Sequence, residues 1–357
     1  MKKTGTATKT PAGRKAPARA SKAAGQQKAV LLVNLGSPDS PSVPHVRKYL
    51  KQFLMDGYVI DAPYPIRWMI VNLFVLPFRP KRSAEAYHKI WTKEGSPLLV
   101  FTKRFAERLQ KFSKHRIYWA MRYGHPAISS VLTLMRDAGH KEVLLAPLYP
   151  HYALSTTVTV VEEAKLHAKD LGLTLSVLPP FYESKAHQDV LARQVKKATA
   201  AHDFVLFSYH GLPVSHIRKA DATGSHCLKN TNCCVVHSAA HSTCYRHQVI
   251  ETTNAVARGA GLSADRYGFA FQSRLGRAEW LTPNTVDFVT DLARKGIRRL
   301  AVIAPAFVAD NLETLEEIDM QIREAFMAAG GEKFTYLPCL NDEPDWVKGF
   351  AGLLDKA

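Results

Sequence analysis

Short apolar segments separated by helical patterns recur along the whole chain, and they constrain its fold more than any other feature. The candidate strands are residues 29–34, 116–122, 142–148, 174–178, 203–209, 266–272, 300–304 and 334–337. The clearest helical patterns between them cover residues 96–112, 157–170, 187–200 and 312–329. Strands that alternate with helices of this length are typical of an α/β protein, in which helices cover both faces of a parallel sheet.

The strands divide into two groups of four, with Pro179-Pro180 between them. A proline pair is a common boundary signal. We therefore predict an N-terminal α/β domain over residues 29–178 and a C-terminal α/β domain over 179–357. A weak internal similarity agrees with two related halves, because AVLLVNLGSP (29–38) and FVLFSYHGLP (204–213) both run from an apolar strand into a Gly and a Pro.

The formal charge of +17 is concentrated in part at the N-terminus, where residues 1–28 carry eight Lys or Arg and no acid. Such a segment cannot bury enough apolar surface to fold, so we predict a disordered basic arm, with a transit peptide as the alternative. It lacks the apolar region of a secretory signal, which favours an intracellular protein. We expect no nucleic-acid partner, because no basic stripe with interleaved aromatic residues follows in the remaining chain.

The most apolar stretch, WMIVNLFVLPF (68–78), is too short to span a bilayer, for which ~20 residues are needed. Basic residues flank it: Arg67, Arg79, Lys81 and Arg82. Two interpretations remain open from the residues alone. The segment is either a buried core helix or a surface that enters a membrane interface.

Ligands of open α/β sheets bind beyond the carboxyl ends of the strands, which selects a few polar residues. His210 ends a nearly apolar strand, where partial desolvation would keep its ring neutral and available as base or ligand. Glu313 follows the seventh strand, and Asp310 three residues earlier gives a pattern close to a capping box. Glu317 lies one helical turn further on the same face. A structural histidine and a solvated acidic stripe are the alternatives to a proton- and metal-handling site.

The commonest uses of such a fold lack their motifs here. There is no Gly-x-Gly-x-x-Gly after the first strand, no Walker lysine loop and no Gly-x-Ser-x-Gly elbow. The sequence therefore gives no support to a nucleotide-binding protein or to a serine hydrolase.

Four of the five cysteines lie within eighteen residues, in the pattern C-x5-C-C-x9-C formed by Cys227, Cys233, Cys234 and Cys244. Four thiolates at this density can hold a tetrahedral zinc or a small iron–sulfur cluster. The histidines of the same segment, His226, His237, His241 and His247, leave a mixed Cys/His zinc site possible.

From LLVNLGSPDS to LPCLND the sequence closely resembles the ferrochelatase family. The motifs are VRKYLKQFLMD, KIWTKEGSPL, MRYGHP, LYPHYALSTT, FSYHGLP, FQSRLGRAEWLTPNT and FVADNLETLEEID. The resemblance implies two similar Rossmann-like halves, each a four-stranded parallel sheet with flanking helices, and a porphyrin cleft between them. It further implies a lyase of haem biosynthesis that inserts ferrous iron, as substrate, into protoporphyrin IX and releases two protons.

The resemblance also implies roles for individual residues. His210 and Glu313 would form the catalytic pair and contact the substrate iron, while Asp310 and Glu317 would extend the acidic side. Arg122 and Tyr123 would line the porphyrin pocket. Gln321 stands where the family pattern carries a further acid, so a longer carboxylate relay is not expected.

Residues 58–80 correspond to the lip of the family's cleft, which implies peripheral contact with a membrane. A cytoplasmic protein at the bacterial inner membrane is expected, and an enzyme that delivers porphyrin is a possible partner. A non-catalytic porphyrin or haem carrier, an iron–sulfur sensor on the same fold and a sirohydrochlorin-type chelatase are the rival functions.

The cysteine segment, about residues 224–247, resembles that of bacterial members with four internal ligands to a [2Fe–2S] cluster. Animal-type members instead use one internal ligand, and Leu154 occupies that position here. The resemblance therefore assigns Cys227, Cys233, Cys234 and Cys244 to a [2Fe–2S] cluster, with zinc as the second choice. Cys339 is expected to be structural.

Overall fold

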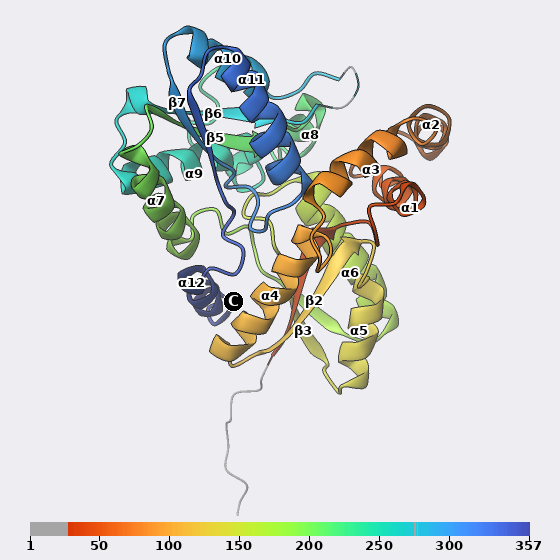
Figure 1. Ribbon diagram of the computed structural model, residues 1–357. Coiled ribbons are helices and arrows are strands. Elements are labelled where there is room, and N and C mark those ends of the chain that lie inside the picture. Colours follow the sequence, from red (N-terminus) through yellow and green to blue (C-terminus); the bar gives the residue numbers. More distant parts are fainter. Residues whose placement is uncertain (1–27, 275, 277) are drawn as a thin grey trace, which may run out of the picture.

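The computed structural model describes residues 28–274, 276 and 278–357, so nearly all of the predicted basic arm lies outside the described residues. The described chain forms two lobes, one above the other in Figure 1. Each lobe is built on one sheet. The predicted division into two α/β halves is therefore visible in the arrangement of the sheets.

Each sheet has four parallel strands, and the strand order is the same in both. The first sheet has the order β2-β1-β3-β4, with β1 Ala29–Gly36, β2 Arg116–Tyr123, β3 Glu142–Pro147 and β4 Thr174–Val177. The second has the order β6-β5-β7-β8, with β5 Phe204–His210, β6 Tyr267–Gln272, β7 Arg299–Ile303 and β8 Lys333–Leu337. The eight predicted strands are all confirmed, and each predicted end lies within about two residues of the observed one.

The two sheets repeat each other in detail. The strands of the similar sequences, β1 and β5, both lie at an inner position of their sheet. After the edge strand, the Met121 N–H donates to the Pro126 carbonyl at 2.7 Å, and the Phe271 N–H donates to the Pro283 carbonyl at 2.8 Å. A helix follows in both cases, α5 (Ile128–Asp137) and α10 (Thr285–Arg294). The halves are therefore structural repeats, as their sequences suggested.

Helices cover both faces of each sheet because successive side chains of the apolar strands point to opposite faces. In β1, Leu31 and Val33 pack with α5 and α6 (Thr159–Asp170), whereas Val30 and Leu32 face α4 (Pro97–Phe112). In the second half, α10 and α11 (Arg323–Ala328) cover one face, and α7 (Lys185–Thr199) and α9 (Tyr245–Ala260) cover the other. The remaining short helices are α8 Val214–Lys219, η3 Ala239–Ser242 and η4 Ala264–Arg266.

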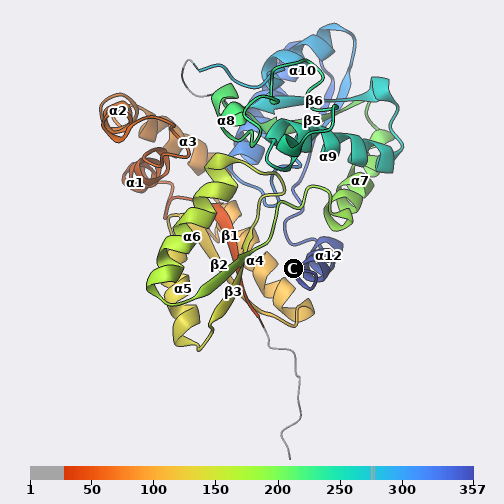
Figure 2. The same cartoon turned by 180° about the vertical axis from the view of Figure 1, so that it is seen from behind.

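The last helix, α12 (Pro344–Leu354), lies between the lobes and packs against both α4 and α7 (Figure 2). Trp346 is fully buried there, with its ring centroid 5.8 Å from that of Phe105 and 5.9 Å from that of Phe181. One core therefore continues from the first half through α12 into the second. The packing of α12 against α4 and α7 therefore connects the two halves.

Before β2, the chain forms a helical projection at one side of the molecule (Figure 1). It consists of α1 Val43–Leu54, α2 Tyr64–Met69, the π-helix η1 Ile70–Val75 and α3 Arg79–Ile90. Its own small core includes Val46, Leu54 and Val71, and Leu312 and Leu315 of the second half pack against it. In the described part of the chain, no helix has the length and apolar character needed to cross a membrane.

Two further π-helices, η2 (Leu154–Val158) and η5 (Glu313–Ile322), lie at equivalent places in the two repeats. Each follows the third strand of its half and leads into a helix, α6 or α11. The predicted helix over residues 312–329 is thus confirmed in extent but begins with π geometry. Short π segments within helices occur frequently at functional sites.

Candidate active site

His210 is the last residue of β5 and is half-buried. Its Nδ1 lies 2.7 Å from the Gly211 carbonyl oxygen, which can only accept a hydrogen bond. Nδ1 therefore carries a proton and donates it to this carbonyl, and among the described residues none is hydrogen-bonded to Nε2. The Tyr245 hydroxyl donates to the backbone oxygen of His210 at 2.9 Å, which fixes the strand end.

Glu313 begins η5 on the opposite side of the site and belongs to a different strand connection. Burial raises the pKa of its carboxyl, as does the charge of Glu317, whereas the charges of His210 and Arg79 lower it. His210 and Glu313 are 103 positions apart in the sequence (313 minus 210), yet they follow two neighbouring strands, β5 and β7, that pair in the same sheet. A half-buried carboxyl with a raised pKa binds a proton more readily than an ordinary glutamate.

Three side chains of the projection surround Glu313. Burial raises the pKa of Tyr49 and Tyr87, and the charge of Glu313 raises both further. Burial lowers the pKa of Arg79, and Glu313 raises it. These residues come from α1 and α3, far from Glu313 in sequence, so no local pattern could reveal them.

The capping pair before η5 lies one residue later in the sequence than predicted. The Thr314 N–H donates to Asn311 Oδ1 at 3.0 Å, and the Asn311 N–H donates to Thr314 Oγ1 at 3.0 Å. This reciprocal pair replaces the expected pairing of Asp310 with Glu313.

The Asp310 carboxylate is buried and is hydrogen-bonded to side chains of the second half. One carboxylate oxygen accepts from the Tyr336 hydroxyl at 2.6 Å and the other from Asn341 Nδ2 at 2.7 Å. The Cys339 N–H also donates to it, at 3.2 Å. Asp310 therefore holds the turn before η5 to the loop after β8, which differs from the substrate-binding role expected for it. Buried Cys339 is part of the same packing.

Arg122 and Tyr123 also point into the protein, because Asp56 binds both. The Arg122 Nη2 and the Tyr123 hydroxyl each lie 2.8 Å from Asp56 Oδ2, and Thr159 Oγ1 donates to the same oxygen. The Tyr123 side chain is fully buried. The bonds of Arg122 and Tyr123 to Asp56 join β2 to the loop after α1, and no local pattern marks Asp56 as their partner.

The acidic face of η5 is confirmed in part. Glu317 is hydrogen-bonded by Ser273 and Gln272 at the end of β6. Gln321 donates to Glu316 Oε2 at 2.7 Å, and Glu316 in turn pairs with Lys89 of α3 at 3.1 Å. Glu316 was not predicted as part of the site. The Lys89–Glu316 pair joins the projection to η5 and so helps to hold the two sides of the site together.

The four thiols of the cysteine segment are buried and converge. Cys233 Sγ lies 3.9 Å from Cys234 Sγ, and the Cys244 thiol is in hydrogen-bonding contact with those of Cys227 and Cys234. Burial raises the pKa of the Cys227 thiol to about 11. Among the described residues, no group of three or more His, Cys, Asp or Glu side chains stands where it could hold a metal ion.

Two of these thiols accept hydrogen bonds from N–H groups. The Leu228 N–H donates to Cys233 Sγ at 3.4 Å, and Arg246 Nη1 donates to Cys234 Sγ at 3.1 Å. Donors of this kind stabilise cluster-bound thiolates. His226 and His241 donate to the Cys233 carbonyl and His247 to the Cys234 carbonyl, so these rings support the backbone of the segment.

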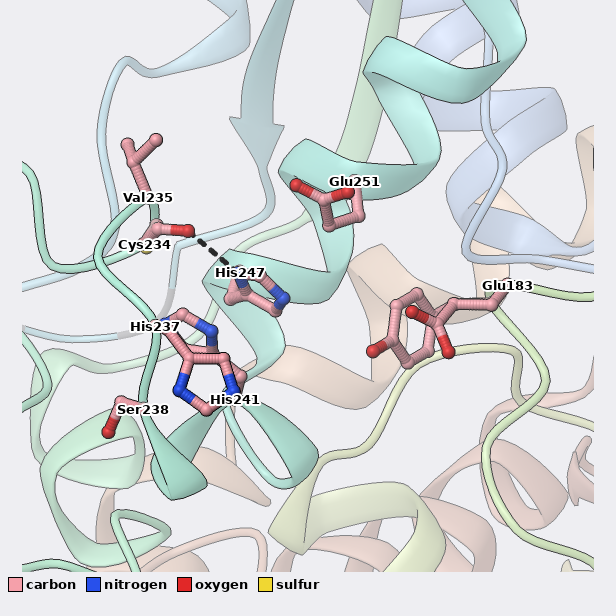
Figure 3. Close-up of a pocket in the computed structure, with 9 residues that line it drawn as sticks. Glu183, Cys234, Val235, His237, Ser238, His241, His247 and Glu251 are labelled. Carbon is pink, nitrogen blue, oxygen red and sulfur yellow. Dashed lines mark hydrogen bonds between the residues drawn. The ribbon is translucent and has the colours of Figure 1, made fainter.

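A cavity of about 380 Å³ opens beside the cysteine segment (Figure 3). His237, His241 and His247 are grouped on one side of it and Glu183 lies opposite. Neither His210 nor Glu313 lines this cavity. The candidate active site is therefore defined by convergent side chains of both halves and not by this opening.

The fold of this chain, two repeated four-stranded parallel sheets with flanking helices, is shared with a solved structure. A solved structure of SirB from Bacillus subtilis with Fe3+ has a TM-score of 0.52 at 10% identity, covering 93% of this chain and 95% of that one. At this identity the similarity shows the shared fold alone.

The sequence comparisons identify the particular family. The ferrochelatase family model matches residues 27–357. A ferrochelatase of Pseudomonas fluorescens (strain Pf0-1) is 48% identical over 334 residues, covering 92% of this chain and 98% of the relative. A ferrochelatase of Azotobacter vinelandii is 47% identical over 330 residues, covering 91% and 97%. The chain belongs to the ferrochelatase family and is a metal chelatase of the lyase class.

Proposed function

We propose that this chain inserts ferrous iron into protoporphyrin between its two halves, with His210 and Glu313 as the catalytic pair. The observation that supports this most directly is that His210 ends β5 while Glu313 begins η5 after the neighbouring strand β7, so both follow the carboxyl ends of paired strands. The product is haem, and two pyrrole protons leave for each iron inserted. Iron is a substrate of the reaction and not a resident cofactor.

The chemistry required of the site matches the properties of the two side chains. A porphyrin carries two N–H protons in its plane, and a base must remove them before the metal can bind all four nitrogens. Because the Gly211 carbonyl engages Nδ1 of His210, Nε2 is the ring nitrogen placed to act as a base toward a pyrrole proton. The Glu313 carboxyl, whose pKa is raised, can hold and pass on a proton. Carboxylate and imidazole are also ligands that can replace water on ferrous iron.

Competition between substrates separates this function from that of a sirohydrochlorin-type chelatase. We expect the protein to consume protoporphyrin with ferrous iron much faster than a sirohydrochlorin-type ring with cobalt or nickel. Anaerobic assays with each ring and each metal, followed by absorbance, provide the measurement. Faster reaction of the sirohydrochlorin-type ring with cobalt or nickel would instead show that the protein is a sirohydrochlorin-type chelatase.

We further propose that Cys227, Cys233, Cys234 and Cys244 bind a [2Fe–2S] cluster. Buried thiols that converge, with N–H donors on two of the sulfurs, support this assignment. The reaction transfers no electrons, so the cluster would supply cross-links within the segment from Asp221 to His247. The Asp221 carboxylate already accepts from the Cys227 N–H at 2.7 Å and ties this segment to the end of α8.

Replacement of one ligand tests the cluster without reference to activity. We expect Cys244→Ser to reduce bound iron from ~2 per chain to near zero and to remove the visible absorption of the cluster. Cys339→Ser is the matched control, because Cys339 is an equally buried thiol outside the segment. Stoichiometric zinc in place of iron in the purified protein would favour the second choice of metal.

We also propose that the projection contacts a membrane surface. Phe74 and Phe78 expose 65% and 77% of their surface, and other large apolar residues of the segment are exposed beside them. These are Tyr64, Ile66, Trp68, Met69 and Leu73. Lys81, Arg82 and Lys51 lie close by in sequence and are exposed. An apolar surface edged by basic residues suits peripheral binding to an anionic inner membrane from the cytoplasm, where a porphyrin-delivering enzyme could act.

Vesicle binding tests this surface. We expect the double variant Phe74→Ser/Phe78→Ser to bind anionic lipid vesicles at least about tenfold more weakly, because each aromatic side chain contributes ~1.5–3 kcal/mol when buried. Phe112→Ser is the control, because Phe112 is 51% exposed but lies at the end of α4. Equal binding of all three proteins, measured by co-sedimentation, would contradict the proposal.

A further inference from the structure

Gln272 connects the acidic helix to the sheet through three hydrogen bonds. Its Nε2 donates to the Glu313 carbonyl at 3.0 Å and to Glu317 Oε2 at 3.3 Å. Its Oε1 accepts from Ser208 Oγ at 2.6 Å. Only this orientation of the amide fits, because the reversed one would turn an oxygen toward two acceptors. Gln272 and Ser208 are both buried, so water does not compete for these groups.

The same residue fixes the strand end that carries His210. Gln272 and His210 are paired in the β5–β6 register, and the Gly211 N–H donates to the Gln272 carbonyl at 2.6 Å. A Cβ on Gly211 would lie 2.8 Å from that carbonyl oxygen, so only glycine permits this approach. Gln272 is therefore bonded both to the residue after His210 and to the first residue of η5.

Ser273 adds two donors to the same carboxylate. Its N–H donates to Glu317 Oε1 at 2.8 Å, and its hydroxyl donates to Glu317 Oε2. Its backbone has a φ of 61°, a left-handed conformation that is uncommon for a residue other than glycine. Such conformations cost free energy and concentrate at functional sites. Here the conformation directs both donors toward Glu317.

We propose that Gln272 and Ser273 are positioning residues for iron insertion, which set the place of Glu313 relative to His210 by anchoring the first turn of η5. The inference rests on the proposed function of that pair. Gln272 holds the backbone of Glu313 directly, and both residues hold Glu317 one turn later. With these bonds removed, the first turn of η5 can shift, while the residues themselves make no contact with the reacting atoms.

A double-mutant cycle tests this role. We expect Gln272→Leu to reduce kcat for ferrous-iron insertion at least about tenfold, with the KM for protoporphyrin unchanged within about twofold, because small displacements of a catalytic group are costly. Glu317→Gln removes the shared partner. If Gln272 acts through the η5 anchor, the double variant loses less than the product of the two single losses.

Gln248→Leu is the matched control for the loss of a buried amide. Gln248 of α9 is fully buried, donates to the His241 and Ser242 carbonyls and accepts from the Tyr152 N–H, so its hydrogen bonds among the described residues go to partners other than His210, Glu313 and Glu317. The Gln248→Leu variant should have a lower melting temperature than wild type, with little change in the kcat of the folded protein. Ser273→Ala is the second variant if Gln272→Leu does not fold. It keeps the backbone N–H and should lower kcat about three- to tenfold.

The outcomes separate this inference from the function on which it rests. Wild-type protein that makes no haem overturns the proposed function. Wild-type protein that makes haem, while Gln272→Leu or Ser273→Ala retains full kcat, overturns the positioning role alone. Independent losses that multiply in the cycle, or an equal loss of kcat in Gln248→Leu, also overturn it.

Discussion

His210→Ala should lower kcat for ferrous-iron insertion by about 10²–10⁴-fold, the usual contribution of a positioned general base. The physical reason is that Nε2 is the free nitrogen of a ring whose other nitrogen is held by the Gly211 carbonyl. Alanine leaves no group at that strand end to accept a pyrrole proton. Porphyrin binding, measured by fluorescence, should survive the change, because the substitution removes a base and opens space.

His140→Ala is the control for the histidine substitution. His140 is also half-buried and is hydrogen-bonded to the Tyr118 hydroxyl at 3.1 Å, at the distant end of the first sheet. Its loss should leave kcat within about twofold. Activity of His210→Ala within a few-fold of wild type would show that another group takes the protons.

Glu313→Gln should lower kcat by about 10²-fold or more and, at neutral pH, raise the melting temperature. Burial raises the pKa of Glu313, so keeping its carboxylate charged in the folded state costs stability. A glutamine of the same shape removes that cost together with the ability to exchange a proton. Loss of activity with a gain in stability is the expected signature of a strained functional group.

The sign of the pH dependence follows from the raised pKa. The penalty is fully present when pH exceeds the folded-state pKa and disappears below the ordinary glutamate pKa of about 4.3. The stability advantage of Glu313→Gln should therefore vanish as the pH falls below about 4. Thermal melts across this range provide the measurement, with Glu107→Gln on the exposed face of α4 as control for the lost charge. A variant that is less stable than wild type at pH 7 would contradict the assignment.

The fold was readable because its determinants are local and periodic. Buried parallel strands such as β1 and β5 appear as continuous apolar runs, and the helical patterns between them have the length of a crossover. His210 and Glu313 are predicted as site residues on a similarly local basis, since the carboxyl ends of parallel strands meet at one edge of a sheet.

What could not be predicted depends on partners distant in sequence. Arg122 faces inward because Asp56, 66 residues away, binds it, and Asp310 is buried because Tyr336 of β8 and Asn341 of the loop after β8 bind it. The cap moved to Asn311 and Thr314 because this pair satisfies both backbone groups at once. The Tyr49, Tyr87 and Arg79 environment of Glu313 depends on the packing of the projection against η5. None of these long-range contacts produces a periodic pattern in the sequence.

The most direct test of the central claim is an anaerobic single-turnover experiment with wild-type protein, protoporphyrin and one equivalent of ferrous iron. We expect the free-porphyrin spectrum to convert to that of haem, with iron consumed in equal amount and two protons released per haem. Tight porphyrin binding with no consumption of iron would contradict the enzyme assignment and make the protein a porphyrin carrier or sensor on the chelatase fold.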